Sequence, residues 1–246
     1  MKRFMTLLKI EQRLSLRCPD GLIFGIGMPV GVLLMIGLIA GQQTISQENY
    51  TFLQSAFASL ITVGICATAF MGIPLTIANY RDKKILKHFF VTPMSPKLIL
   101  CVQFCIGAII SILSALLVSI CAIVIFHYQM EGSILYFILA YCLILVSMYS
   151  LGMIIASLCP NLKVANVVCT FVYFPMLFLS GATIPFEIFP QFIQNLAKVL
   201  PLTQGISLLK DISLGIYHQD MIYSIIYLLV MAIIGCIISL KTFQWE

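Results

Sequence analysis

The nine cysteines are the first candidates for metal binding or covalent chemistry in this chain of 246 residues. Most of them fall inside long apolar runs. Cys101 and Cys105 stand four residues apart, on one face of a helix, but no histidine or carboxylate joins them as a zinc site requires. We therefore interpret the cysteines as small residues of membrane helices and expect no metal site and no disulfide framework.

Hydrolysis would need an activated nucleophile. Ser180 precedes Gly181 and superficially resembles a protease serine, but activation requires a base within hydrogen-bond reach. The three histidines fall outside the apolar runs, at His88, His127 and His218. The chain also contains no G-x-x-x-x-G-K-[ST] loop with which to hold a nucleotide. We predict that it is not an enzyme and carries no catalytic or cofactor-binding residue.

The composition indicates a membrane protein. Hydrophobic residues make up 61% of the chain and charged residues only 9%, whereas about 25% of the residues of a soluble domain are charged. In lipid each segment must satisfy its own backbone hydrogen bonds, so the long apolar runs predict helices. We expect one all-α integral membrane domain over residues 1–246, with six spans at about 22–40, 52–78, 98–126, 133–158, 164–184 and 221–240.

The basic residues predict the orientation. If six spans alternate across the membrane, twelve of the fourteen Lys and Arg residues fall on one side, and only Lys198 and Lys210 fall on the other. Cytoplasmic loops carry the excess of Lys and Arg. Both termini are therefore predicted to lie in the cytoplasm, with the chain crossing the inner (plasma) membrane several times.

Two features of the N-terminal part concern packing. Residues 1–21 predict an amphipathic interfacial helix whose bases face anionic lipid, although Glu11 falls on its apolar side; a simple topological anchor is the alternative. The first span then carries a stripe of small residues that would let another helix approach closely, within one chain or between two. Its predicted helix-packing residues are Gly21, Gly25, Gly27 and Gly31.

The loop at 79–97, predicted to be cytoplasmic, carries a second amphipathic pattern. On a helical wheel four bulky apolar residues gather opposite the bases; they are Ile85, Leu86, Phe89 and Phe90. One interpretation is a lipid-facing connector whose bases serve only topology. The other is a short helix that docks into a cytoplasmic partner and acts as a lever on the adjoining spans.

The stretch "LSGATIPFEIFP" (179–190) interrupts the apolar pattern with a glycine and two prolines. Apolar residues then recur at i, i+3, i+4 and i+7 between 189 and 200, which predicts a surface-lying helix, and a second piece follows at 203–214. We expect segment 185–220 to be extracellular and to re-enter the outer leaflet as a gate or lid. A plain interfacial loop is the alternative.

Both segments resemble the signature of type-2 ATP-binding-cassette (ABC-2 type) permeases, in particular daunorubicin-resistance-like export subunits. The family pattern of Ser-Gly, spaced prolines and a final glycine is matched in order by Ser180, Gly181, Pro185, Pro190, Pro201 and Gly215. The loop pattern is matched by Arg81-Asp82, Leu86, Phe89-Phe90 and Thr92-Pro93. Lys84-Ile85 and Lys87 depart from it, which leaves the details of partner contacts open.

The resemblance implies an export permease for an amphipathic or hydrophobic substrate such as a drug, peptide or lipid. Two copies of a separate ATPase subunit would hold ATP and Mg²⁺, and the permease would form a homodimer or a heterodimer in lipid, without nucleic acid. An ion-coupled secondary transporter is the alternative, but the span interiors lack the ionisable residues such carriers use.

The resemblance also implies roles for individual residues. The ATPase-coupling set is Arg81, Asp82, Lys84, Leu86, Phe89, Phe90, Thr92 and Pro93, and the extracellular gate is Ser180, Gly181, Pro185, Glu187 and Pro190. Charge reversal at Arg81 and Lys84 is then expected to release the ATPase. Gly181→Leu or Pro185→Leu is expected to impair export with the ATPase still bound.

Overall fold

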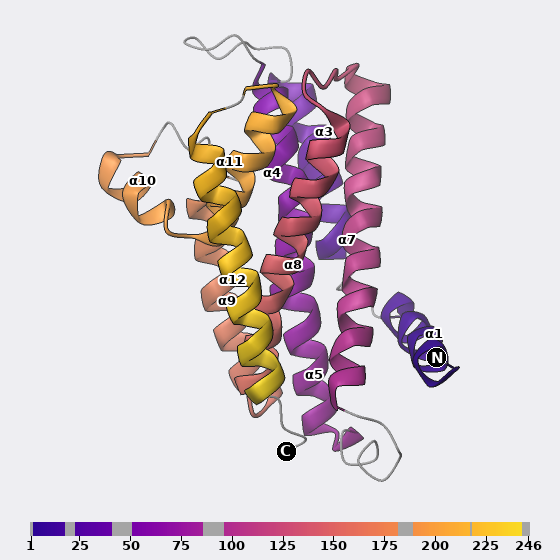
Figure 1. The fold of residues 1–246 in the computed structure, drawn as a ribbon. Helices are drawn as coiled ribbons and strands as arrows, with labels where there is room; N and C mark the ends of the chain where they lie inside the picture. The colour runs from indigo at the N-terminus through magenta and orange to yellow at the C-terminus, as the bar shows by residue number, and fades with distance from the viewer. Residues whose placement is uncertain are drawn as a thin grey trace.

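The chain forms a bundle of helices, shown by the computed structural model for residues 2–17, 23–40, 51–85, 96–181, 189–216 and 218–242 (Figure 1). The α-helices are α1 (Lys2–Arg17), α3 (Met28–Ala40), α4 (Phe52–Ala67), α5 (Ile73–Asp82), α7 (Pro96–Phe126), α8 (Ile134–Leu158), α9 (Leu162–Leu179), α10 (Gln191–Ala197), α11 (Pro201–Ser213) and α12 (Asp220–Thr242). Two π-helical turns, η1 (Ile23–Gly27) and η2 (Thr68–Gly72), precede α3 and α5. The described residues contain no β-strand, which confirms the all-α prediction.

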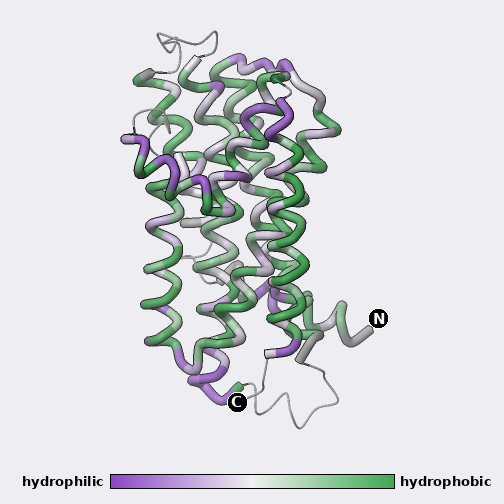
Figure 2. The backbone as a smooth tube through the Cα atoms, turned by 60° about the vertical axis from the view of Figure 1, so that its left-hand side comes forward, coloured by the Kyte–Doolittle hydropathy of each residue, from purple (hydrophilic) through white to green (hydrophobic). Residues whose placement is uncertain are grey.

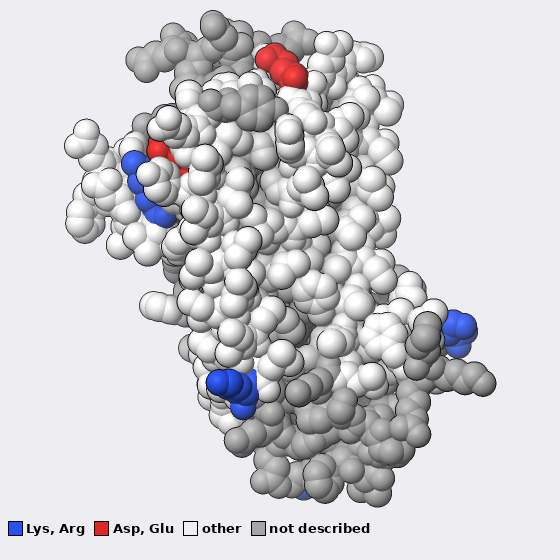
Figure 3. Space-filling view, viewed as in Figure 1, with Lys and Arg blue, Asp and Glu red and all other residues white. Residues whose placement is uncertain are grey.

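Five helical segments are long and apolar enough to cross a membrane. They are Phe52–Asp82, Leu98–Phe126, Ile134–Leu158, Leu162–Leu179 and Asp220–Thr242. A shorter apolar helix, Gly25–Ile39, stands where the first of six spans is predicted. Hydrophilic residues gather at the two ends of the bundle (Figure 2), and on the face shown in Figure 3 a broad uncharged belt separates the charged side chains.

The segment α4–η2–α5 forms the centre of the bundle. Its side chains are buried along most of its length, including Leu60, Ile65 and Phe70, and it contacts α3, α7, α8, α9 and α11. At Gly152 of α8 an added Cβ would lie 2.1 Å from the carbonyl oxygen of Ala69. Only glycine therefore allows α8 this close to η2.

The π-turns lie next to prolines. Pro29 is the second residue of α3, directly after η1, and Pro74 is the second residue of α5, directly after η2. Proline has no N–H and leaves a carbonyl of the preceding turn without its usual donor. A π-turn is one way to absorb this disruption within a continuous helix. Both turns therefore stand where a proline disrupts the regular α-helical hydrogen bonding, although Pro175 lies inside α9 without such a turn.

The two ends of the bundle hold different elements. Helix α1 and the end of α12 lie at one end, whereas α10 and α11 lie toward the other (Figure 1). The apolar side of α1 packs through Leu7, Phe4 and Leu8 on a cluster that includes Ile99 and Val102 of α7. A helix thus forms within the predicted segment 1–21, and part of its apolar face contacts protein.

Candidate coupling site and transport face

Arg81, predicted to contact an ATPase, is directed at the end of α8. Its guanidinium donates hydrogen bonds from Nη1 to the carbonyl oxygens of Ala156 (3.0 Å) and Cys159, and from Nη2 to that of Ser157 (3.2 Å). The last carbonyls of a helix have no intrahelical donor and carry the negative end of the helix dipole. The planar, permanently charged guanidinium satisfies several of them at once.

Asp82 binds the start of the next helix. Its Oδ2 accepts a hydrogen bond from the backbone N–H of Leu162 at 3.0 Å. This N–H is the first of α9, where a carboxylate is stabilised by the positive end of the dipole. Asn161 caps the same helix through Val164 N–H at 2.8 Å. Two consecutive residues of opposite charge therefore hold both sides of the α8–α9 turn.

The hydrogen bonds of Glu11 explain why this acidic residue lies on the apolar side of α1. It is only 7% exposed, and its Oε2 accepts hydrogen bonds from the Tyr80 hydroxyl of α5 (2.6 Å) and from Nε2 of Gln103 of α7 (2.9 Å). Burial raises the pKa of the Glu11 carboxyl, while the hydrogen bonds from Tyr80 and Gln103 lower it. The carboxylate thus joins α1 to two other helices.

The chain leaves α5 abruptly after Asp82. Lys83 and Lys84 form an exposed turn, and Lys84 adopts a left-handed backbone with φ of 56°. Residues 79–82, which the sequence assigns to the loop, belong to α5 instead. The remaining coupling residues, Leu86, Phe89, Phe90, Thr92 and Pro93, lie outside the described residues.

The predicted gate begins at the C-terminal end of α9. The Ser180 side chain is 2% exposed and donates to the carbonyl oxygen of Leu177. Gly181 has φ of 80°, a backbone conformation that residues other than glycine adopt only with strain. Its carbonyl oxygen accepts a hydrogen bond from the Ser59 hydroxyl of α4 at 3.5 Å. The break after α9 therefore lies against the central helix.

The rest of the predicted gate is described only in part. Pro190 is the N-cap of α10, and α10 and α11 form near the two predicted helical pieces. Buried apolar residues line one face of α11, among them Leu202, Leu208 and Leu209. Pro185 and Glu187 lie outside the described residues.

The glycine stripe of the first apolar helix divides between two directions. A Cβ added at Gly25 would lie 3.0 Å from Cγ2 of Thr68, so this glycine packs within the chain. Gly27 and Gly31 face outward and would meet nothing within 4 Å. Gly21 lies outside the described residues.

A ring of hydroxyls was not predicted from the sequence. Thr68 of η2, Ser111 of α7 and Tyr149 of α8 lie within hydrogen-bond distance of one another, at 2.6 to 2.7 Å. Gly107 gives the Tyr149 ring room, because an added Cβ would lie 2.5 Å from it. Each residue is unremarkable in sequence, and only the helix packing brings them together.

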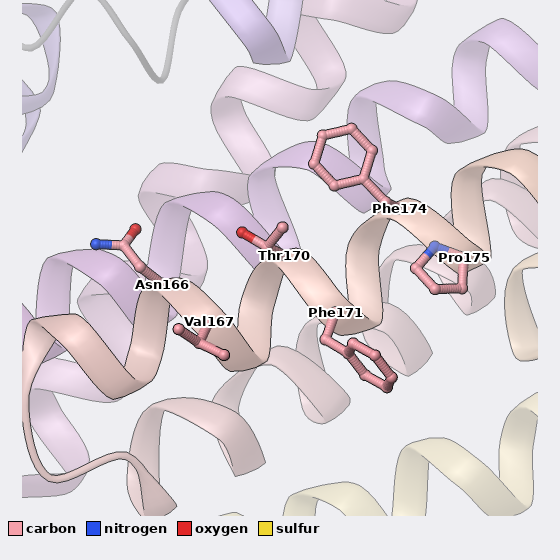
Figure 4. Close-up of a pocket in the computed structure, with 6 residues that line it drawn as sticks. All are labelled: Asn166, Val167, Thr170, Phe171, Phe174 and Pro175. Carbon is pink, nitrogen blue, oxygen red and sulfur yellow. The ribbon is translucent and has the colours of Figure 1, made fainter.

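Helix α9 presents a mixed face outward. A shallow groove of about 540 Å³ is lined by Asn166, Val167, Thr170, Phe171, Phe174 and Pro175. Figure 4 shows Asn166, Thr170 and Phe174 along one side of the helix and Val167 and Phe171 along another. Uncharged polar groups and aromatic rings thus share one surface of a membrane-spanning helix.

The described residues hold no cluster of three or more His, Cys, Asp or Glu residues that could bind a metal ion.

The profile of the ABC-2 type transporter family matches residues 2–214, from α1 through α11. The chain belongs to the ABC-2 type transporter family. The resemblance seen in the sequence is therefore confirmed.

Several proteins are similar to this ABC-2 chain. Nodulation protein J of Rhizobium meliloti (strain 1021) is 28% identical over 196 residues, covering 80% of this chain and 72% of that protein. Inner membrane transport permease YhhJ of Escherichia coli (strain K12) is 25% identical over 133 residues, covering 54% and 36%. Probable multidrug ABC transporter permease YbhR of the same strain is 24% identical over 170 residues, covering 69% and 45%.

Membership in this family gives the general role of the chain. An ABC-2 permease is the transmembrane subunit of an ABC transporter and is generally paired with a separate ATPase subunit. Together with the apolar helices, this makes the chain a multi-pass membrane subunit of a transporter.

Proposed function

We propose that this ABC-2 permease exports an amphipathic or hydrophobic substrate along α9, driven by ATP hydrolysis on a partner. Two permease copies, or one copy and a homologue, form the pathway above two ATPase subunits. The chain crosses the membrane six times, counting Gly25–Ile39, with both termini in the cytoplasm. The observation that carries the proposal is the outward face of α9.

This face is unsuited to lipid alone. Phe171 is 79% exposed and Val167 69%, while Asn166 and Thr170 also point outward beside them. An amide without a hydrogen-bond partner in hydrocarbon costs several kcal/mol. A substrate with an apolar body and an uncharged polar group would cover the rings and bond the amide and hydroxyl. A second permease beside this face would complete the pathway.

The end of the bundle near α1 is the proposed ATPase side. Lys83 and Lys84 project there from the end of α5, at the start of the segment whose pattern predicts a docking helix. An acidic or polar groove on the ATPase would receive this segment. Charge reversal at Lys84 is expected to release the ATPase, because the Lys84 side chain is exposed and close to the predicted docking helix.

The opposite end supplies the proposed extracellular gate. Gly181 ends α9 in a left-handed conformation against Ser59, so a bulky residue there would strain the turn and displace the end of α9. Gly181→Leu is expected to impair export and leave the ATPase bound. Normal export by Gly181→Leu and Pro185→Leu together would count against the gate.

The α9 face is tested by substituting its side chains in the complex with its ATPase, reconstituted in lipid vesicles. Asn166→Leu and Phe171→Ala are compared with Ile233→Ala, an outward residue of α12 that is 51% exposed. The measurement is the stimulation of ATP hydrolysis by a panel of amphipathic dyes, peptides and lipids. Loss or altered selectivity in the α9 variants, with Ile233→Ala unchanged, supports the pathway.

Two results would overturn the proposal. Identical stimulation profiles for the α9 and α12 variants would remove α9 from the pathway. Transport by the chain alone that survives ATP depletion but stops when the ion gradient is collapsed would identify a secondary transporter.

A further inference from the structure

Three consecutive residues at the end of α5 bond three other helices, and Glu11 extends this network to a fourth. Tyr80 bonds Glu11 of α1, which also bonds Gln103 of α7. Arg81 bonds the last carbonyls of α8, and Asp82 bonds the first N–H of α9. We refer to Glu11, Tyr80, Arg81, Asp82 and Gln103 as the α5 node.

We propose that Arg81 and Asp82 are positioning residues that act inside the permease, passing displacement of α1 and α5 to the α8–α9 turn. The proposal rests on the proposed ATP-driven function. It moves this charged pair from the ATPase contact, where the sequence places it, to a junction between helices of the same chain.

The geometry is selective for this role. Helix α8 ends at Leu158 and α9 begins at Leu162, so the turn between them is short. Arg81 neutralises the negative end of one helix dipole and Asp82 the positive end of the other. If α5 shifts, both ends must follow or both sets of hydrogen bonds must break.

An apolar contact reinforces the junction. Ala78 of α5 is buried against Cys159 in the turn and Ala165 of α9. The three side chains are small, which brings the helix axes close together. The charged pair therefore fixes direction while the apolar contact keeps the separation short.

The side of the node that faces α1 and α7 is also held by specific hydrogen bonds. Glu11 is buried between α5 and α7, so α1 is held to the last turn of α5 by a charge-assisted hydrogen bond. Beyond Asp82 the chain turns sharply at Lys84. A displacement of α1, or of the chain after Lys84, therefore acts on the last turn of α5. Arg81 and Asp82 stand on this same turn and bond the ends of α8 and α9.

Leu162→Pro offers a test that removes one bond and leaves both charges. Leu162 is the first residue of α9, where proline is well tolerated, and Asn161 before it has the extended backbone that precedes proline readily, with φ of −148° and ψ of 167°. Proline deletes only the N–H that Asp82 accepts, together with the leucine side chain. Leu162→Ala is the matched control, because it loses the side chain and keeps the N–H.

The experiment measures transmission without needing the substrate. Spin labels at Val164→Cys on α9, a 40% exposed residue outside the groove, and Leu229→Cys on α12, in a cysteine-free chain bound to its ATPase, report the distance between the helices with and without ATP and vanadate. We expect Leu162→Pro, which removes one hydrogen bond to a charged group, to lower the equilibrium constant of the ATP-dependent distance change about tenfold, and Arg81→Ala, which removes several, to lower it further. ATPase binding and hydrolysis continue in both variants. Leu162→Ala and Lys163→Ala, an exposed neighbour, keep the shift.

Opposite results are equally clear. Release of the ATPase by Arg81→Ala in a folded permease would return Arg81 to the ATPase interface and overturn the proposal. A full shift in Leu162→Pro would overturn it as well, even if Arg81→Ala fails to fold. An unmodified complex with no ATP-dependent shift would remove the proposed function, and with it any role for the node.

Discussion

The two ends of the bundle are held together by different physical means. The α5 node uses charged side chains bonded to helix ends, through Arg81, Asp82 and Glu11. The opposite end, which we call the α11 cap, comprises residues 128–132, residues 199–213 and residues 220–227. Neutral backbone bonds join its segments: the Glu131 and Gly132 N–H groups donate to the carbonyl oxygen of Ser213 at 3.2 and 3.3 Å.

The difference lies in how the interaction energy is distributed. The cap buries many apolar side chains of α11, and burial is non-directional and additive over area. The node concentrates its energy in a few directional bonds, each joining a different pair of helices. A small change at the node is therefore expected to alter one connection completely, whereas the cap should respond gradually.

The largest expected effect is at the node. Arg81→Glu would place a carboxylate against the carbonyl oxygens at the end of α8, which already carry negative partial charge. Hydrogen bonds to charged groups contribute about 1.5–3 kcal/mol each, and several are lost, so we expect destabilisation of at least about 3 kcal/mol. Thermal unfolding of the purified permease in detergent measures it. Lys163→Glu, an exposed charge reversal nearby, should change stability little; equal effects of the two would remove the distinction.

At the cap, we expect a steric clash to destabilise the structure more than the loss of a hydrogen bond does. A Cβ at Gly132 would lie 1.7 Å from the carbonyl oxygen of Ile212, a backbone atom that cannot rotate away. Gly132→Ala must therefore displace residues 131–132 from α11, and overpacking of this kind costs about 1–3 kcal/mol. Gly31→Ala on α3 is the matched control, since nothing lies within 4 Å of the added Cβ. An unfolding temperature for Gly132→Ala that equals the control would contradict the contact.

A third prediction separates the hydrogen bonds of Glu11 from the apolar packing of α1. Glu11→Ala leaves the Tyr80 hydroxyl and the Gln103 amide without this acceptor, at about 1–3 kcal/mol for each unsatisfied group. Helix α1 should then detach, measured as faster proteolysis within residues 2–17 while the bundle stays intact. Glu11→Gln retains an acceptor oxygen and should detach less. If both variants protect α1 as well as the unmodified chain does, apolar packing of Leu7 alone holds the helix.

The helices themselves were largely predictable from sequence. The predicted spans at 98–126 and 133–158 correspond to α7 (Pro96–Phe126) and α8 (Ile134–Leu158), because apolar runs in lipid leave little choice of structure. Boundaries set by single residues were less predictable. The fifth span ends at Leu179, before the predicted 184, because Ser180 and Gly181 form a turn.

The node could not be predicted in detail. Glu11 was visible as an acid on an apolar face, yet its partners stand 69 and 92 residues away. Arg81 was singled out, but it bonds backbone carbonyls, and every residue supplies a carbonyl, so no sequence pattern identifies which ones. Sequence thus locates unusual residues, while packing decides whether they serve a partner protein or a neighbouring helix.

The smallest expected effect is at the cap and comes from a single neutral bond. The Tyr227 hydroxyl of α12 donates to the carbonyl oxygen of Val199 at 2.6 Å near the surface. Tyr227→Phe removes this bond with the ring retained and should cost about 0.5–1.5 kcal/mol in thermal unfolding. The nearby bond from Ser224 to Gln204, at 2.7 Å, joins α12 to α11 in parallel, so the double variant with Ser224→Ala should lose roughly the sum of the two single effects. A loss far above that sum would mean that the cap, like the node, depends on a few connected bonds. The contrast between the two ends would then be one of charge alone.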